Sequence, residues 1–164
     1  MSGPVVLHEV RLLQVPIAVH ARAQEHNAEL MREMYLIAQQ RHHEAEESGT
    51  VKELPARLVE LVEALTGEFA ALTTAQDRLL DDAIAQGVPE IDVIYQIPVA
   101  ASPAAQQLGS MLDAADDFCR AGQHLLTLAT PPELVRYRRW YLGEFVAQLA
   151  DGPATPWPEY TESA

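Results

Sequence analysis

Cysteine is nearly missing from this chain, since Cys119 is the only one among 164 residues. A lone thiol cannot form an internal disulfide or a cysteine-based zinc site, so we interpret Cys119 as a small buried hydrophobe on a helix. The sequence also lacks Glu-x-x-His and His-Glu-x-x-His, the histidine motifs of helical metal sites. It contains no glycine-rich phosphate loop and no Gly-x-Ser-x-Gly elbow. We therefore expect no metal, no cofactor and no catalytic residues, which indicates a protein that is not an enzyme.

Positive charge is scarce as well. The 11 lysine and arginine residues are outnumbered by 24 aspartate and glutamate residues, and the formal net charge is -13. Nucleic acids and anionic membrane surfaces repel such a protein, so we expect neither as a partner. No stretch is apolar for long enough to span a membrane, and the first dozen residues lack the pattern of a signal peptide. The simplest compartment for this chain is the cytoplasm.

Apolar residues make up 48% of the sequence, which is enough to build a packed core. We therefore expect a single domain over residues 1–164. Its apolar residues recur with helical periodicity in four segments, near residues 17–41, 55–86, 103–128 and 131–150. The fold class that we predict is an all-α bundle of four long helices, without a substantial sheet.

Four other segments have no helical period. Residues 5–15 and 88–101 predict an extended lead-in and an extended crossover between the second and third helices, and the two could pair as a small ribbon. Residues 42–53 are polar and predict a flexible loop, followed by a helix that starts at Pro55. Prolines break the tail at 152–164, which we expect to be irregular.

Two helix predictions depend on local motifs. The second helix has an apolar heptad seam that continues through Leu79, which predicts one long helix, with a break near Thr73 as the alternative. Thr130 precedes two prolines and a glutamate, so we expect it to cap the fourth helix. On the third helix, we place Asp113 and Asp116 on the polar face.

Polar residues interrupt the apolar faces of the first and fourth helices. His20, Gln24 and Asn27 are spaced four and three residues apart, so they share one side of the first helix. Arg138 lies in the middle of the apolar stripe of the fourth helix, where an unpaired guanidinium would cost several kcal/mol. We predict that these four side chains face one another across the bundle, because pairing would relieve the burial of both sets.

The negative charge that Arg138 requires has two candidate sources. Glu9, Glu25 or Asp92 could fold over it, which would make the network structural. A bound anion or carboxylate ligand would instead make the same residues a sensor site between the first and fourth helices.

A second candidate site lies on the outside of the fourth helix. Arg136, Arg139 and Trp140 project away from its apolar stripe, and arginine and tryptophan dominate the hot spots of protein interfaces. These residues predict a surface that binds a protein partner. The alternative is that they pack under the tail, where Trp157 must itself be covered.

Two blocks of sequence are similar to a known family. Residues 15–33 (VPIAVHARAQEHNAELMRE) and 125–145 (LLTLATPPELVRYRRWYLGEF) resemble an uncharacterised family of small helical actinobacterial proteins. Genes of that family often lie near anti-sigma-factor kinases, STAS-domain antagonists and PP2C-type phosphatases. The resemblance implies a role in partner-switching signalling, with an anti-sigma or STAS-type regulator as the partner.

These observations lead to two hypotheses of function. The first is a non-enzymatic regulatory or adaptor protein that acts through protein–protein contacts, and it leaves a homo-oligomer open. The alternative is a small-molecule sensor whose polar pocket lies between the first and fourth helices.

Overall fold

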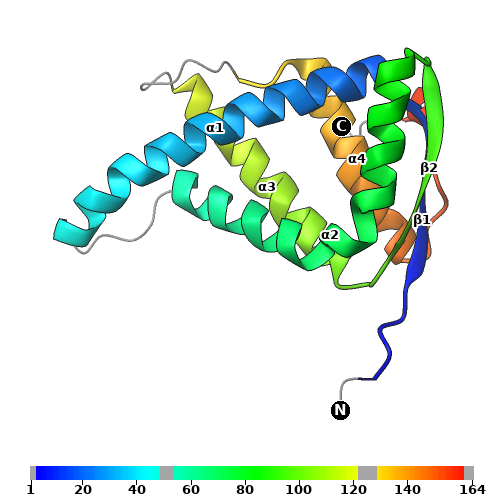
Figure 1. The fold of residues 1–164 in the computed structure, drawn as a ribbon, viewed down its shortest axis with the longest axis horizontal. Helices are drawn as coiled ribbons and strands as arrows, with labels where there is room; N and C mark the ends of the chain where they lie inside the picture. The colour runs from blue at the N-terminus through cyan, green and yellow to red at the C-terminus, as the bar shows by residue number, and fades with distance from the viewer. Residues whose placement is uncertain (1–2, 49–53, 122–128, 161–164) are drawn as a thin grey trace.

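The computed structural model describes residues 3–48, 54–121 and 129–160. Its elements follow in the order β1 (His8–Pro16), α1 (Ile17–Ser48), α2 (Leu54–Gln86), β2 (Glu90–Ile97), α3 (Ala101–Arg120), α4 (Pro132–Leu149) and one turn of 3-10 helix at Trp157–Glu159. The described chain is mostly helical, as predicted, but it is not purely all-α, because β1 and β2 form a two-stranded sheet (Figure 1). None of the helices in these ranges is long and apolar enough to cross a membrane.

The first helix is longer than the sequence predicts. It continues through Ser48, so the prediction of a loop is wrong for residues 42–48, while 49–53 lie outside the described residues. Glutamate and alanine are strong helix formers, and adding residues to a helix that has already nucleated costs less than starting a new one. Residues 122–128, the predicted end of the third helix, also lie outside the described part of the chain.

The ribbon that the sequence suggests is present, since β1 and β2 pair antiparallel with a bulge between Leu12 and Val15. Gln14, inside the bulge, has a φ of 55°, and its N–H donates to Asp92 Oδ1 at 2.8 Å. A bulge leaves one backbone group without a partner in the ladder, and here a side chain supplies that partner. Asp92 therefore stabilises the bulge of the sheet.

Glutamine side chains cover both outer edges of this small sheet. The amide of Gln148, on α4, pairs with the backbone N–H and carbonyl of Arg11 at 2.8 Å each. The amide of Gln76, on α2, donates to the carbonyl of Ile94 at 2.9 Å. Uncovered strand edges invite pairing with other chains, so these two contacts tie the sheet to the helices and protect it.

Helix α2 changes direction near its middle, and its second half packs on the sheet (Figure 1). The hydroxyl of Thr74 donates to the carbonyl of Ala70 at 2.6 Å, a contact that often bends helices. Beyond the bend, Leu80 is buried while the predicted seam residue Leu79 is 46% exposed, and the next seam residue, Ala83, is buried again. The prediction of one long helix is confirmed, and the predicted heptad seam is wrong at Leu79 but holds at Ala83.

Helices α2 and α4 end in the same backbone motif. After α2, Gly87 has a φ of 66° and its N–H donates to the carbonyl of Ile84. After α4, Asp151 has a φ of 64° and its N–H donates to the carbonyl of Gln148. The left-handed conformation satisfies the last carbonyls of each helix, and glycine adopts it at least cost.

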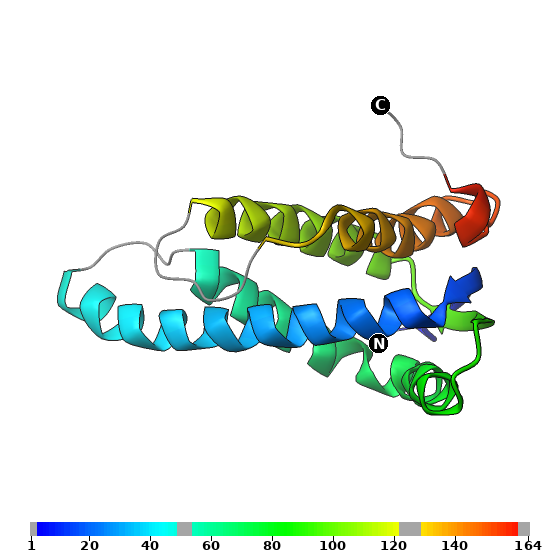
Figure 2. The ribbon, with the colours of Figure 1, turned by 90° about the horizontal axis from the view of Figure 1, so that it is seen from above.

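The buried apolar side chains form two clusters, and α3 and α4 lie on one side of α1 and α2 (Figure 2). The first cluster, which we call the sheet-end core, consists of Val10, Leu12, Val15, Ile17, Val19, Ala23, Leu80, Ala83, Val93, Tyr95, Ile97, Ala101, Leu134, Tyr137, Trp140 and Leu149. The second, the far core, consists of Leu30, Met34, Leu58, Val59, Met111, Leu112, Ala115 and Cys119.

Candidate functional site

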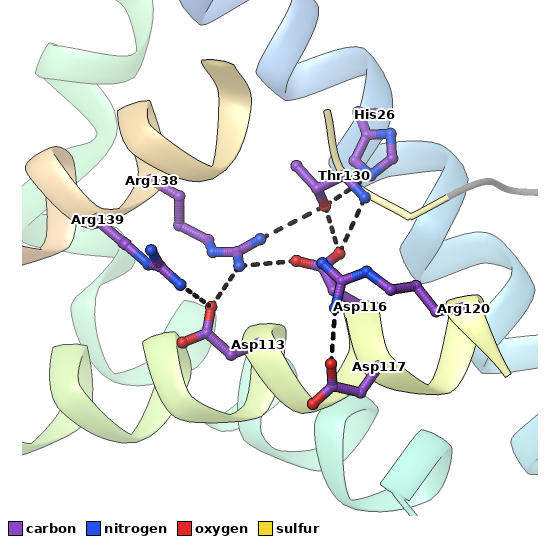
Figure 3. Close-up of polar contacts among 8 residues, drawn as sticks. All are labelled: His26, Asp113, Asp116, Asp117, Arg120, Thr130, Arg138 and Arg139. Carbon is purple, nitrogen blue, oxygen red and sulfur yellow. Dashed lines mark hydrogen bonds and ion pairs between the residues drawn. The ribbon is translucent and has the colours of Figure 1, made fainter. Parts of the chain in front are cut away.

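Arg138 is buried on α4 and binds two carboxylates of α3. Its exposed fraction is 8%, and its Nη2 lies 2.6 Å from Asp113 Oδ1 and 2.8 Å from Asp116 Oδ2 (Figure 3). The antiparallel packing of α3 against α4 places these groups side by side. The negative charge that Arg138 requires is thus supplied by α3.

The three acids suggested by the sequence do not supply this charge. Glu9 pairs with Arg11 on the exposed face of β1, and Asp92 accepts the hydrogen bond from the bulge. Glu25 is exposed on α1. The prediction is wrong because the sheet engages two of these residues, while a nearer carboxylate on α3 reaches the guanidinium.

Asp116 is the most buried charged group of this network, with an exposed fraction of 2%. Its Oδ1 accepts the hydroxyl of Thr130 at 2.5 Å and the Thr130 N–H at 3.1 Å. Burial alone would raise the pKa of Asp116, but the hydrogen bonds from Thr130 and Arg138 outweigh burial and lower it. Asp116 is therefore ionised at neutral pH and compensates the charge of Arg138.

Thr130 joins this network to α1. Because its hydroxyl proton goes to Asp116, its oxygen can only accept from His26 Nε2, at 2.9 Å, so Nε2 of His26 carries a proton. The prediction that Thr130 caps α4 is wrong, since the N-cap residue is Pro131 and no side chain caps the helix. Two successive prolines lack N–H groups, which removes donors that a cap would satisfy.

His20 is a buried polar residue of α1, with an exposed fraction of 7%. Its Nδ1 lies 2.6 Å from the hydroxyl of Tyr137, on α4. Burial lowers the pKa of His20, although the charge of Asp81 opposes the shift, so the imidazole is neutral at pH 7. Burial also raises the pKa of Tyr137, which keeps the phenol protonated.

These side chains border a cavity of about 250 Å³ between α1, α3 and α4, which we call the Arg138 cavity. All four residues that the sequence predicts for a ligand site line it, namely His20, Gln24, Asn27 and Arg138. The rest of the lining is Ala23, His26, Leu108, Leu112, Thr130, Leu134, Tyr137, Tyr141 and Leu142. The structure therefore brings the predicted set to one cavity, but Gln24 and Asn27 are exposed rather than buried. The hydrogen bonds described for Arg138 go to Asp113, Asp116 and Thr130, none of which lies on α1.

A second, more open groove of about 260 Å³ lies next to this cavity, bounded by α2 and β2. Leu108, Tyr141 and Leu142 line both spaces and so form the wall between them. The hydroxyl of Tyr141 is hydrogen-bonded to that of Tyr95, which fixes the ring of Tyr141 in this wall. Burial raises the pKa of Tyr95 to about 12, so this phenol is also protonated.

Trp140 does not lie on a partner surface. Its exposed fraction is 0%, and its indole N–H donates to the carbonyl of Thr155 at 2.8 Å. The prediction is wrong because the tail and the sheet cover a second side of α4, where Tyr137 is also buried. A helix covered on two sides buries residues that lie outside its main apolar stripe.

The two arginines of the predicted partner surface have different environments. The guanidinium of Arg136 lies 4.5 Å from the centre of the Trp157 ring and donates to the carbonyl of Tyr160, so it packs under the tail. Arg139 is 51% exposed and lies 4.0 Å from Asp113. The tail interpretation therefore holds for Arg136, while a partner contact at Arg139 stays a prediction.

Four residues of the network are not among the sequence-predicted site residues: His26, Asp113, Asp116 and Thr130. The two aspartates look like members of a polar face, but Asp116 borders the buried stripe through Leu112, one turn earlier. No local signal in the sequence identifies these aspartates as partners of Arg138, because their pairing depends on the register of α3 against α4.

In the described ranges, no group of three or more histidine, cysteine, aspartate or glutamate side chains is arranged to hold a metal ion. Comparisons with protein-family models, with curated proteins and with solved structures found no match.

Proposed function

We propose that this protein is a non-enzymatic sensor that binds a small molecule in the Arg138 cavity. The observation that supports the proposal is that polar residues from distant parts of the sequence, on α1 and α4, line one cavity together. Ligand sites in proteins combine apolar walls with a few convergent polar groups, and this cavity has both.

The volume of the cavity sets the size of the ligand. A cavity of about 150 Å³ is large enough to hold benzene. The Arg138 cavity, at about 250 Å³, has room for one ring with a polar substituent. It is too small to enclose a nucleotide or a folded peptide.

The test compares two alanine-to-leucine variants of α1. Ala23 lines the cavity and is 9% exposed, whereas Ala28 lies on the exposed side of the same helix. Ala23→Leu fills the cavity without removing a hydrogen bond, and Ala28→Leu is the matched control. In a thermal-shift screen of ring-sized compounds, ligands should raise the Tm of the wild type and of Ala28→Leu, but not of Ala23→Leu. A screen in which no compound shifts the wild type, or in which all three proteins respond alike, would contradict the proposal.

A protein partner is a second proposal, and its support is the segment before β1. Val5 and Val6 are 70% and 68% exposed, and the segment extends away from the body of the molecule (Figure 1). Exposed apolar residues that adjoin one another favour contact with another protein. An anti-sigma or STAS-type regulator, which the family resemblance implies, is the class of partner to test. Binding of such a purified regulator should weaken when both valines are changed to serine, and unchanged binding would count against this surface.

A further inference from the structure

The charges beside the Arg138 cavity already compensate one another. Arg138 and Arg139 contribute two guanidinium groups, and Asp113 and Asp116 contribute two carboxylates (Figure 3). An anion that enters the cavity would meet a guanidinium whose charge is paired and two carboxylates that repel the anion. The protein as a whole, with its net charge of -13, also repels anions. The anion or carboxylate ligand suggested by the sequence therefore loses its electrostatic basis.

Two buried nitrogen atoms of lining residues nevertheless lack a hydrogen-bond partner among the described residues, Arg138 Nε and His20 Nε2. The Nε of an arginine carries a proton and can only donate. When Tyr137 donates its hydroxyl proton to Nδ1 of the neutral His20, Nε2 of His20 carries the remaining proton and is a donor as well. A buried donor without an acceptor is unfavourable, so both atoms favour a ligand that brings an oxygen.

The remainder of the lining is largely apolar. Ala23, Leu108, Leu112, Leu134 and Leu142 come from three different helices and surround the space. These side chains offer no hydrogen bonds, and they favour a ligand with an apolar body. The requirement for an acceptor oxygen and the requirement for an apolar body thus apply to the same molecule.

We infer that the ligand of the Arg138 cavity is a small neutral molecule with an apolar body and one carbonyl or hydroxyl oxygen that accepts a hydrogen bond from Arg138 or His20. The inference rests on the proposed function, because it assumes that the cavity binds a ligand. The inference goes beyond the proposed function because it specifies that the ligand carries no net charge.

Three compounds of similar size but different charge distinguish a neutral ligand from an anionic or a cationic one. Benzamide is neutral, benzoate is an anion and benzylamine is a cation, and each can be titrated into the isotope-labelled protein and followed by NMR. We expect benzamide to bind the wild type and Ala28→Leu about tenfold more tightly than either charged compound, and not to bind Ala23→Leu. If benzoate or benzylamine binds in the cavity as tightly as benzamide, the inference is overturned and the proposed function stands. If none of the three binds, the inference also fails, and the thermal-shift screen decides the proposed function separately.

Replacing one carboxylate by an amide tests directly whether the compensated charge of Arg138 disfavours anionic ligands. Asp116→Asn leaves the charge of Arg138 partly uncompensated, so the affinity for benzoate should rise about tenfold while the affinity for benzamide changes little. Asp113→Asn is a milder version, because Asp113 is 48% exposed, and it should act in the same direction even if Asp116→Asn fails to fold. An unchanged preference in the variant that folds would show that charge compensation does not select the ligand.

Discussion

The sheet-end core and the far core differ in what covers them. Two strands, α4 and the tail close the sheet-end core, and Trp140 and Tyr95 are 0% and 2% exposed there. The buried residues of the far core, between α1, α2 and α3, include no aromatic ring, and Leu36 on α1 is 56% exposed. Among the described residues, the fully buried large aromatic rings lie where the sheet and the tail add cover to the helices.

The Arg138 cavity lies where the two cores meet. Ala23 and Leu134 of its lining belong to the sheet-end core, and Leu112 belongs to the far core. Thr130 and Arg138, which belong to the charged network of α3 and α4, line one side of this cavity.

The largest effect that we expect is the loss of the central aromatic ring. Trp140→Ala should lower the free energy of unfolding by about 4 kcal/mol, because it removes a fully buried indole and leaves a cavity. Met34→Ala in the far core should cost about 2 kcal/mol, because three helices can collapse around the gap more easily. Urea denaturation measures both. If Met34→Ala lowers the free energy of unfolding as much as Trp140→Ala or more, the far core tolerates truncation no better than the sheet-end core.

The control for Trp140 is its neighbour Arg139, which is half exposed. Arg139→Ala should change stability by no more than about 0.5 kcal/mol. If Arg139→Ala lowers the free energy of unfolding as much as Trp140→Ala, stability depends on this whole turn of α4 and not on the burial of Trp140.

Breaking the charged network should have the next largest effect. Arg138→Met leaves Asp116 buried without its cation and should cost about 3 kcal/mol. The double variant Arg138→Met with Asp116→Asn should lose less than the sum of the single variants, since the second change removes the uncompensated charge. Strict additivity in denaturant unfolding would show that the two groups do not stabilise each other.

Much of this arrangement could be predicted from local sequence. Prolines and helical periodicity predicted the four helices, and alternation predicted the two strands as an extended lead-in and crossover. The interruption of an apolar stripe by Arg138 correctly predicted a buried guanidinium whose charge must be compensated. These features are encoded within a few residues of where they occur.

The rest depends on contacts between distant segments. The burial of Trp140 requires the tail to fold back over α4, which no periodicity in the helix indicates. The choice of Asp116 as the partner of Arg138 requires the register of α3 against α4, and the engagement of Asp92 requires a bulge in the sheet. Beyond the bend of α2, likewise, Leu80 is buried and Leu79 is exposed.

The pH dependence of stability tests whether His20, which lines the Arg138 cavity, is buried as a neutral imidazole. Burial lowers the pKa of His20 below its ordinary value of 6.5, so the unfolded chain binds more protons than the folded one below that pH. The free energy of unfolding should therefore fall as the pH drops from 7.5 to 5.5, and by less in His20→Asn. An identical pH profile in His20→Asn would contradict the burial of a neutral imidazole.

The smallest effect concerns the ends of the helices. Asp151 has a left-handed backbone, which glycine adopts more readily, so Asp151→Gly should stabilise the protein by about 0.5–1 kcal/mol. Gly87→Ala, at the end of α2, should destabilise it by a similar amount. Thermal unfolding resolves both changes. If Asp151→Gly lowers the Tm, the side chain of Asp151 contributes more than its backbone strain costs.

A crystal structure of the protein grown with benzamide is the most direct test of whether the Arg138 cavity binds a neutral ligand. We expect the benzamide ring between α1, α3 and α4, with its carbonyl oxygen within hydrogen-bond distance of Arg138 Nε or His20 Nε2, and with the pair of Arg138 and Asp116 intact. Benzamide bound elsewhere, or a cavity closed by the protein's own side chains at saturating benzamide, would contradict the inference of a neutral ligand.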